Sequence, residues 1–348
     1  MTVVDSLPDT IPDEATLDEV MSRPSPGLIE SIARGTGDLL VLGAGGKMGP
    51  TVARMARRAF EAAGREGQVI AVSRFSDPAA RAGLEAAGVA TIAGDLLEPT
   101  FLRGLPDAPE VVFMAGRKFG STGAEHLTWA MNAHLPGLVA RRFREARCVV
   151  FSTAAVYPFV PTDSAGADED LEPEPIGEYA QSCLARERMF EHAAHTWGTR
   201  SALIRLSYAL DLRYGVLHDV GASLREGRPV DVGMSTASVI WQGDACDLIL
   251  RTLEHTAAPP LTLNVSGLAP IRIRDVAVAM GEVLEVEPAF EGVESESALF
   301  VDCSRMAELV GEPMTPLETV LGWTADWLRA GGRTLDKPTH FEVRDGKY

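Results

Sequence analysis

The chain has 348 residues, 46% of them hydrophobic, and a formal net charge of −17 at pH 7. Its length suits one large α/β domain with an appended lobe, or two modest domains. So acidic a chain repels nucleic acid and anionic membrane surfaces, and no stretch is apolar for long enough to span a membrane. The N-terminus lacks the basic flank and apolar core of a signal peptide, and four scattered cysteines have neither disulfide-framework nor metal-ligand spacing. We therefore expect a reduced, cytoplasmic protein without a metal site.

Apolar runs and amphipathic stretches alternate along the first part of the chain. Residues 1–37 are acidic and punctuated by proline, and we expect an N-terminal extension with two short helices. Buried parallel strands are expected at residues 39–42, 69–72, 89–92, 111–114, 149–152 and 202–206. Helices are expected between them at residues 49–63, 78–87, 126–146 and 178–195. The alternation predicts an α/β fold with a Rossmann-like, doubly wound parallel sheet.

The regular alternation of predicted strands and helices ends after Leu206. We expect helices at residues 218–225, 273–286 and 317–330, a strand at 261–265, and a further helix with Asp244 as its N-cap. The predicted organisation is a Rossmann domain at residues 38–206, to which 239–266 returns. A small C-terminal α/β lobe follows at 207–238 and 267–335, and residues 336–348 form a polar tail.

A glycine-rich turn joins the first predicted strand to the first long helix. In Leu42-Gly43-Ala44-Gly45-Gly46-Lys47-Met48-Gly49, Gly43 can make the tight turn, Gly46 can admit a pyrophosphate, and Gly49 can let the helix pack closely. The helix N-terminus adds unpaired N–H groups and a partial positive charge. An ordinary glycine loop is the alternative, but the position between strand and helix favours a dinucleotide. The predicted contacts are Gly43, Gly45, Gly46, Lys47, Met48 and Gly49.

The end of the second predicted strand bears on which dinucleotide is bound. NAD-preferring folds place an acid there for the ribose hydroxyls, whereas this chain has Ser73 followed by Arg74. Serine and arginine suit a 2′-phosphate. We therefore predict NADP, with NAD as the alternative.

Several motifs together resemble the extended short-chain dehydrogenase/reductases, of the NAD-dependent epimerase/dehydratase type. Besides the glycine turn, they are Gly94-Asp95-Leu96, Val111-Val112-Phe113-Met114-Ala115-Gly116, Asn132, Phe151-Ser152-Thr153-Ala154-Ala155-Val156-Tyr157, Tyr179, Asp244 and Leu263-Asn264-Val265-Ser266-Gly267. The resemblance covers roughly residues 38 to 330. It implies cofactor contacts at Asp95, Leu96, Met114, Ala115, Gly116 and Tyr179, and catalytic roles for Thr153 and Tyr179. It also implies a homodimer formed through the helices at 126–146 and 178–195.

One departure from the family pattern concerns the catalytic tyrosine. The family has Tyr-x-x-x-Lys, whereas Tyr179 is followed one helical turn later by Cys183. Tyrosine has an unperturbed pKa of about 10 and is a poor base without a nearby cation, which a thiol does not supply. The candidate replacements are Lys118, Arg117, Arg186 and Arg188.

We favour Lys118 as the replacing cation. It lies with Arg117 in a glycine-containing loop that follows the fourth strand, at the sheet edge where ligands bind in open α/β folds. We expect Lys118 to approach Tyr179 or the substrate, and Arg117 and Lys118 to suit a carboxylate or phosphate. A solvent-exposed basic loop is the alternative.

A second departure concerns the substrate. Nucleotide-sugar members carry a Gly-x-Gln-x-Arg segment, for which this chain has Val232-Gly233-Met234-Ser235-Thr236-Ala237-Ser238-Val239, so a nucleotide-sugar substrate is disfavoured. The hypothesis is an NAD(P)-dependent oxidoreductase acting on a small hydroxyl or carbonyl compound such as a sugar or sugar acid. Tyr157 and Arg213 are further candidates for substrate contact, beside Arg117 and Lys118. The alternatives are an epimerase or dehydratase with tightly bound cofactor, and a non-catalytic NAD(P)-binding sensor or scaffold.

Overall fold

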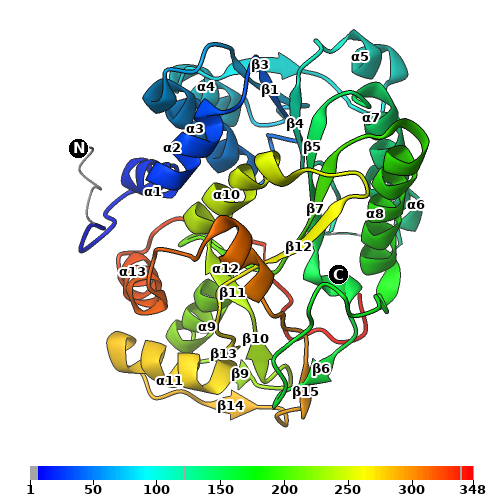
Figure 1. The fold of residues 1–348 in the computed structure, drawn as a ribbon. Helices are drawn as coiled ribbons and strands as arrows, with labels where there is room; N and C mark the ends of the chain where they lie inside the picture. Colours follow the sequence, from blue (N-terminus) through cyan, green and yellow to red (C-terminus); the bar gives the residue numbers. More distant parts are fainter. Residues whose placement is uncertain (1–6, 119, 121–122, 338, 348) are drawn as a thin grey trace.

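A seven-stranded parallel sheet forms the centre of the computed structural model, which describes residues 7–118, 120, 123–337 and 339–347. The strand order is β12-β7-β5-β4-β1-β2-β3 (Figure 1). The strands are β1 (Leu39–Leu42), β2 (Val69–Ser73), β3 (Ala90–Ala93), β4 (Glu110–Phe113), β5 (Arg147–Thr153), β7 (Ser201–Leu206) and β12 (Leu261–Val265). The chain order reverses between β1 and β4, which makes this the switch point where ligands bind in doubly wound folds.

Helices cover both faces of the sheet (Figure 1). Leu39 and Val41 of β1 belong to one core, with helices α2 (Pro26–Ala33), α3 (Gly49–Ala63) and α10 (Gln242–Arg251). Leu40 and Leu42 belong to the other core, with helices α7 (Leu135–Arg142) and α8 (Gly177–Trp197). Because successive strand residues point to opposite faces, strands buried on both faces must be apolar throughout. The predicted doubly wound α/β fold is confirmed.

The described part of the N-terminal extension is packed on the main domain. Helix α1 (Glu14–Met21) buries Leu17 and Met21, and Leu28 and Ile32 of α2 enter the same core as α3 and α10. The Ser25 backbone N–H and hydroxyl both donate to the Asp247 carboxylate, at 2.7 and 2.8 Å. These helices therefore complete one face of the sheet.

The predicted long helix at residues 126–146 is wrong in its middle and at its end. The structure has α6 (Glu125–Trp129), a π-helical turn (Ala130–His134) and α7, which ends at Arg142. Pro136 has no N–H to donate to the carbonyl four residues earlier, so a regular α-helical ladder is interrupted at this place. The wide turn carries Asn132, whose side chain is fully buried.

The prediction that Asp244 caps a helix is also wrong. Helix α10 begins at Gln242, so Asp244 lies inside its first turn. Its carboxylate instead accepts hydrogen bonds from the Thr315 backbone N–H at 2.8 Å and from the Thr315 hydroxyl at 3.1 Å. Asp244 thus ties the Rossmann domain to a segment near the C-terminus.

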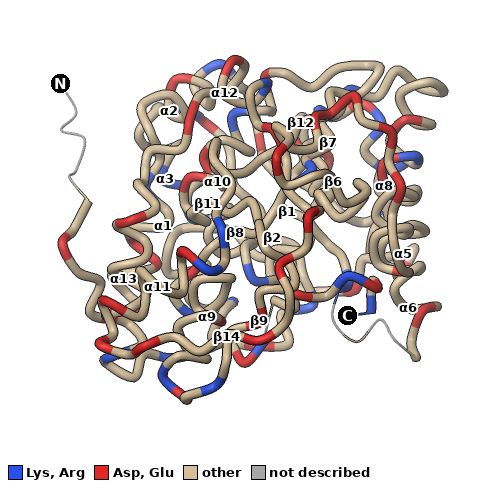
Figure 2. Tube along the Cα trace, turned by 90° about the horizontal axis from the view of Figure 1, so that it is seen from below, with Lys and Arg blue, Asp and Glu red and all other residues tan. Residues whose placement is uncertain are grey.

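A second lobe lies below the sheet in Figure 1. Helices α9 (Val216–Arg225), α11 (Ile273–Leu284) and α13 (Leu317–Arg329) pack on one another. The small strands around them are β6 (Val160–Pro161), β8 (Tyr208–Leu210), β9 (Val230–Asp231), β10 (Thr236–Ala237), β11 (Val239–Trp241), β13 (Ile271–Arg272), β14 (Phe290–Glu291) and β15 (Ser297–Ala298). Figure 2 shows acidic and basic segments mixed around α9, β9 and β14.

The remaining helical elements of the described chain are short. They are α4 (Pro78–Ala86), α5 (Pro99–Gly104), α12 (Ser304–Val310) and the 3₁₀ turns Ala154–Val156 and Thr252–His255. No helix among the described residues combines the length and apolar character needed to cross a bilayer.

Candidate active site

A cavity of about 290 Å³, the switch-point cavity, opens where β1, β2, β3 and β4 end. Ten of its lining residues were predicted from the sequence as cofactor contacts: Gly43, Gly45, Gly46, Ser73, Arg74, Asp95, Leu96, Met114, Ala115 and Gly116. The structure therefore brings these residues to one place. The remaining predicted contacts, Lys47, Met48, Gly49 and Tyr179, are not among its lining residues.

The glycines of the turn are not all required for the same reason. Gly43 has φ +97, and a Cβ there would lie 2.5 Å from the backbone nitrogen of Ala115. A Cβ at Gly49 would lie 2.3 Å from the carbonyl oxygen of Ala44, whereas a Cβ at Gly46 would meet only the Gly43 carbonyl oxygen, at 3.4 Å. The fold therefore requires Gly43 and Gly49. The bare surface at Gly46 instead leaves room in the cavity.

A smaller cavity of about 150 Å³, the tyrosine cavity, lies on the other side of the glycine turn. Thr153 reaches it from the end of β5, Tyr179 from the first turn of α8, and Lys118 from the segment after β4. Lys47 and Met48 of the glycine turn also line it. Thus the three residues predicted to be catalytic share one cavity. The second lobe contributes Tyr208, Tyr214 and Leu299 to the same wall.

The Tyr179 side chain is hydrogen-bonded to Thr153 and to the Cys183 thiol, which lies one helical turn away. Burial, together with Cys183, raises the pKa of Tyr179 well above its ordinary value, against the opposing effect of Arg186. Burial also raises the pKa of the Cys183 thiol. Both side chains are therefore neutral near pH 7, and Tyr179 can donate a proton there but not accept one.

Lys118 is the cation that the structure brings into the tyrosine cavity from the predicted loop. Its ammonium nitrogen lies 6.0 Å from the centre of the Tyr179 ring and 5.8 Å from that of Tyr208. It donates a hydrogen bond to the Thr339 carbonyl oxygen at 3.1 Å. Burial lowers the pKa of Lys118 from 10.5 to about 8, so the side chain remains mostly charged at pH 7.

Arg186 is a second cation near Tyr179, but its geometry is fixed. Its guanidinium donates to the Phe151 carbonyl oxygen and, at 2.9 Å, to the side-chain oxygen of Asn132. The same Asn132 oxygen accepts the Arg117 backbone N–H at 2.8 Å. Arg186 therefore acts on Tyr179 by its charge and, through Asn132, also holds the loop that carries Lys118.

The other two candidate cations do not line the tyrosine cavity among its described residues. Arg188 is paired with Glu191 at 2.8 Å on the outer side of α8. The Arg117 guanidinium donates to the Gly120 carbonyl oxygen at 2.8 Å within its own loop. The loop residues Phe119, Ser121 and Thr122 lie outside the described residues.

The Lys47 side chain contacts the second lobe. Its ammonium nitrogen lies 2.9 Å above the centre of the Tyr214 ring. Burial lowers its pKa from 10.5 to about 7. The sequence placed this lysine only at the cofactor, because its contact with a tyrosine far along the chain follows no local pattern.

Tyr157 and Arg213, both predicted to contact substrate, have other partners. Tyr157 is buried, its hydroxyl donates to Asn264 at 2.9 Å, and it accepts from Arg205 at 2.8 Å. Arg213 is held by Asp211, at 2.8 Å, and by Glu14, at 3.0 Å. Tyr157 thus belongs to a buried network behind Thr153, while Arg213 fastens α1 to the second lobe.

The C-terminal tail is bonded to Lys118, which lines the tyrosine cavity. Thr339 is fully buried, and its backbone N–H and hydroxyl donate to Asp219 of α9 at 2.7 and 2.6 Å. Its carbonyl oxygen accepts from Lys118. The expected polar tail therefore bridges the second lobe and the Rossmann domain. No local pattern predicts this bridge, because the contacts join residues far apart along the chain.

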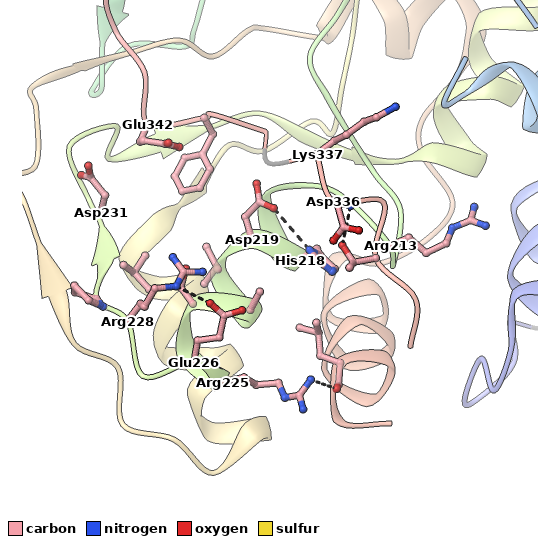
Figure 3. A pocket seen from close by; sticks show the side chains of 18 of the residues that line it. Arg213, His218, Asp219, Arg225, Glu226, Arg228, Asp231, Asp336, Lys337 and Glu342 are labelled. Carbon is pink, nitrogen blue, oxygen red and sulfur yellow. Dashed lines mark hydrogen bonds and ion pairs between the residues drawn. The ribbon is translucent and has the colours of Figure 1, made fainter. Parts of the chain in front are cut away.

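A further cavity, of about 650 Å³, is lined by second-lobe and tail residues, and we call it the second-lobe cavity. Figure 3 shows acidic and basic side chains around it, including Asp219, Glu226, Arg228 and Glu342. Arg228 pairs with Glu226 at 2.7 Å. Neither Thr153 nor Tyr179 lines it, so we place the reaction elsewhere. Among the described residues, no three His, Cys, Asp or Glu side chains are grouped to hold a metal ion.

Comparisons with known proteins show the family and the fold. The model of the NAD-dependent epimerase/dehydratase family matches residues 39–265. No curated protein matches the sequence. A UDP-galactose 4-epimerase structure is similar at 21% identity and a TM-score of 0.67, over 84% of this chain and 99% of that one.

Two further solved structures are similar over 84% of this chain and 99% of theirs, each at 16% identity. They are a UDP-glucuronic acid 4-epimerase from Bacillus cereus with UDP-glucuronic acid and NAD, at a TM-score of 0.68, and a UDP-glucose 4-epimerase from Thermotoga maritima with UDP-glucose, at 0.70. At these identities the likeness establishes the fold.

Proposed function

Because the chain belongs to the NAD-dependent epimerase/dehydratase family, we propose that it moves a hydride between a nicotinamide dinucleotide and a small hydroxyl or carbonyl compound. A sugar or sugar acid is the substrate class that fits best, since the similar structures are sugar-nucleotide epimerases. The observation that carries this proposal is the Tyr179–Thr153 pair, which shares one cavity with Lys118. The pair lies directly beside the glycine turn.

The described residues suit a dinucleotide that passes from one cavity to the other. The adenosine half would lie in the switch-point cavity, against Asp95 and Leu96. The pyrophosphate would pass Gly46 near the start of α3, where the helix leaves N–H groups without intrahelical acceptors. The nicotinamide would reach Tyr179 in the tyrosine cavity. When bound, this cofactor supplies the hydride, and the protein supplies orientation and proton transfer.

Gly46→Ala should weaken cofactor binding without weakening the fold. The added Cβ meets nothing closer than 3.4 Å within the protein but occupies space that we assign to the pyrophosphate. Overpacking of this kind corresponds to a dissociation constant about tenfold to hundredfold higher. Calorimetric titration with NADPH and a thermal unfolding midpoint would measure both effects.

The matched control is Gly49→Ala, in which the Cβ would collide with the Ala44 carbonyl oxygen at 2.3 Å. This variant should lose stability, whereas Gly46→Ala should keep the wild-type unfolding midpoint. Unchanged NADPH affinity in Gly46→Ala would show that the cofactor does not approach Gly46.

Arg74→Ala should separate the two possible cofactors. Arg74 is exposed at the rim of the switch-point cavity beside Ser73, where a 2′-phosphate would lie. Losing this charge-assisted contact should weaken NADPH binding about tenfold to hundredfold and leave NADH binding unchanged. Tighter binding of NADH than of NADPH by the wild-type protein would instead assign NAD as the cofactor.

The mechanism follows from the protonation states of the site. Thr153 binds the substrate carbonyl oxygen, and neutral Tyr179 donates its proton to that oxygen as the carbonyl is reduced. Lys118 and Arg186 place positive charge near the tyrosinate that this step creates, which lowers the cost of forming it. In the oxidative direction Tyr179 must first lose its proton, and the tyrosinate then takes the hydroxyl proton.

A test follows the nicotinamide absorbance while NADPH is mixed with small hydroxy and oxo acids, sugars and uronic acids. Net consumption of NADPH with formation of the reduced compound supports an oxidoreductase. If no compound in the panel is reduced or isomerised, the proposal fails.

An epimerase or dehydratase that keeps its cofactor bound is a second candidate. The tail favours it, because Thr339 joins Asp219 of the second lobe to Lys118 of the tyrosine cavity, and these bonds would hinder the opening that cofactor exchange needs. Nucleotide that remains with the purified protein, together with isomerised or dehydrated product and no net NADPH change, would assign this activity.

We also propose a homodimer formed through α6 and α8. Apolar side chains are exposed on or next to these helices, including Leu127 and Trp129 on α6 and Ile176 before α8, at 43%, 37% and 41% of their full areas. Such exposed apolar groups are typical of protein–protein contacts. Light scattering would measure the oligomeric state.

The four cysteines are buried and unpaired, which suits the cytoplasmic location that we propose.

A further inference from the structure

Two lysine side chains line the tyrosine cavity from different parts of the Rossmann domain. Lys47 comes from the glycine turn, and Lys118 comes from the segment after β4. Among the described residues that line this cavity, none is acidic. This is unusual in a chain with 49 acidic and 32 basic residues, and it makes the cavity locally positive.

Lys47 is held in a way that leaves its donors available. The face of the Tyr214 ring, 2.9 Å away, attracts the ammonium group without using a conventional acceptor. The hydrogen bonds found among the described residues include none from Lys47. An ammonium group has three N–H donors, so an oxygen anion entering the cavity could accept from it.

The electrostatic surroundings of Lys47 also favour a bound anion. Burial lowers its pKa to about 7, and the charges of Lys118 and Lys337 add to this effect. Asp211 and Asp219 oppose it only in part. An anion bound beside Lys47 would relieve the cost of holding this charge, so anion binding and protonation should favour each other.

The size of the cavity limits the ligand. At about 150 Å³ it is smaller than the roughly 300–1,000 Å³ of pockets that hold drug-sized ligands. Because we also place the nicotinamide here, the cavity leaves room for the reacting end of a small substrate, and a nucleoside diphosphate would have to extend beyond it. The second-lobe cavity is lined by carboxylates such as Asp231, Glu291 and Glu342 beside its basic residues, which does not favour a pyrophosphate.

We propose that Lys47 and Lys118 together bind the anionic group, a carboxylate or a phosphate ester, of a small polyhydroxy substrate whose reacting carbon lies at Tyr179. This inference rests on the proposed function and adds the substrate class to it. The substrate is then a free acid or sugar phosphate, not one joined to a nucleotide. Lys118 binds the anion and also stabilises the tyrosinate, whereas Lys47 binds the anion.

The test is calorimetric titration of the NADPH-loaded protein. The probes are D-glucuronate, D-galacturonate, the 6-phosphates of D-glucose and D-galactose, and the two neutral hexoses. We expect one anionic series to bind about tenfold to hundredfold more tightly than its neutral parents. Preference for the uronates identifies a carboxylate, and preference for the 6-phosphates identifies a phosphate ester. If neither series binds more tightly than its neutral parents, the proposal is overturned.

Lys47→Met keeps the length and the apolar stem of the side chain but removes its charge. It should abolish the preference for the anion. The matched control is Lys337→Met, because Lys337 is an exposed lysine that lines the second-lobe cavity. This control should keep the anion preference.

Two results would separate this inference from the proposed function. If Lys47→Met weakens NADPH binding and keeps the anion preference, Lys47 serves the cofactor and the inference is wrong. Binding needs no turnover, so anion preference without hydride transfer would refute the proposed function alone. Equal reduction of acidic and neutral carbonyl compounds, without binding preference, would refute the inference alone.

Discussion

Tyr179→Phe should reduce the rate of hydride transfer by a factor of about 10² to 10⁴, which is the usual contribution of a positioned general acid. Phenylalanine keeps the ring in place but removes the hydroxyl that is bonded to Thr153. Without it, no proton reaches the oxygen of the substrate as the carbonyl is reduced. Single-turnover measurements with saturating NADPH would give the rate of this step.

The same variant should bind NADPH as tightly as wild type, since the loss concerns proton transfer alone. The matched control is Tyr157→Phe, whose hydroxyl belongs to the network with Arg205 and Asn264 behind the cavity. That variant should lose stability more than rate. A Tyr179→Phe enzyme within threefold of the wild-type rate would contradict the assignment of Tyr179.

Lys118→Met should slow hydride transfer about 10²-fold, the lower end of what one electrostatic donor contributes to catalysis. The variant removes the Lys118 charge near Tyr179, while Arg186 stays fixed by its bonds to Asn132 and Phe151. The tyrosinate formed during reduction is then stabilised by one cation instead of two. Single-turnover rates of the variant and the wild type would measure this loss.

The pH dependence gives an independent signature. Lys118 is charged below its pKa of about 8 and neutral above it. The wild-type rate of reduction should therefore fall as pH rises through about 8, and the fall should be absent in Lys118→Met.

Arg188→Met is the matched control for charge on α8, because Arg188 pairs with Glu191 away from the cavity. Its rate should equal that of wild type. Adding Cys183→Lys to Lys118→Met should restore part of the lost rate, since residue 183 lies one turn from Tyr179 on α8. A wild-type rate in Lys118→Met would show that Arg186 alone suffices.

The sequence predicted the sheet and the glycine turn well, because both depend on local patterns. Continuous apolar runs marked the strands, and Gly43 and Gly49 are required by close backbone contacts within the turn or at the end of the neighbouring strand β4. Thr153 and Tyr179 were found through motifs at the ends of β5 and the start of α8. The structure then placed both in one cavity.

Contacts between distant segments could not be predicted in this way. Lys47 meets Tyr214, and Lys118 meets Thr339, through packing of the second lobe and tail on the Rossmann domain. Arg213 suited a substrate carboxylate by its position, but Asp211 and Glu14 are its partners. No periodicity in the sequence distinguishes an arginine that will find such partners from one that will not.

The most direct test of the account is transfer of deuterium from NADPH labelled at the reactive C4 position to an oxo acid that the protein reduces. Mass analysis of the product gives the result. We predict that wild-type protein places the label on the former carbonyl carbon, that Lys118→Met does so about 10²-fold more slowly, and that Tyr179→Phe does so more slowly still. Product without label, or equal labelling rates in all three proteins, would contradict hydride transfer assisted by Tyr179 and Lys118.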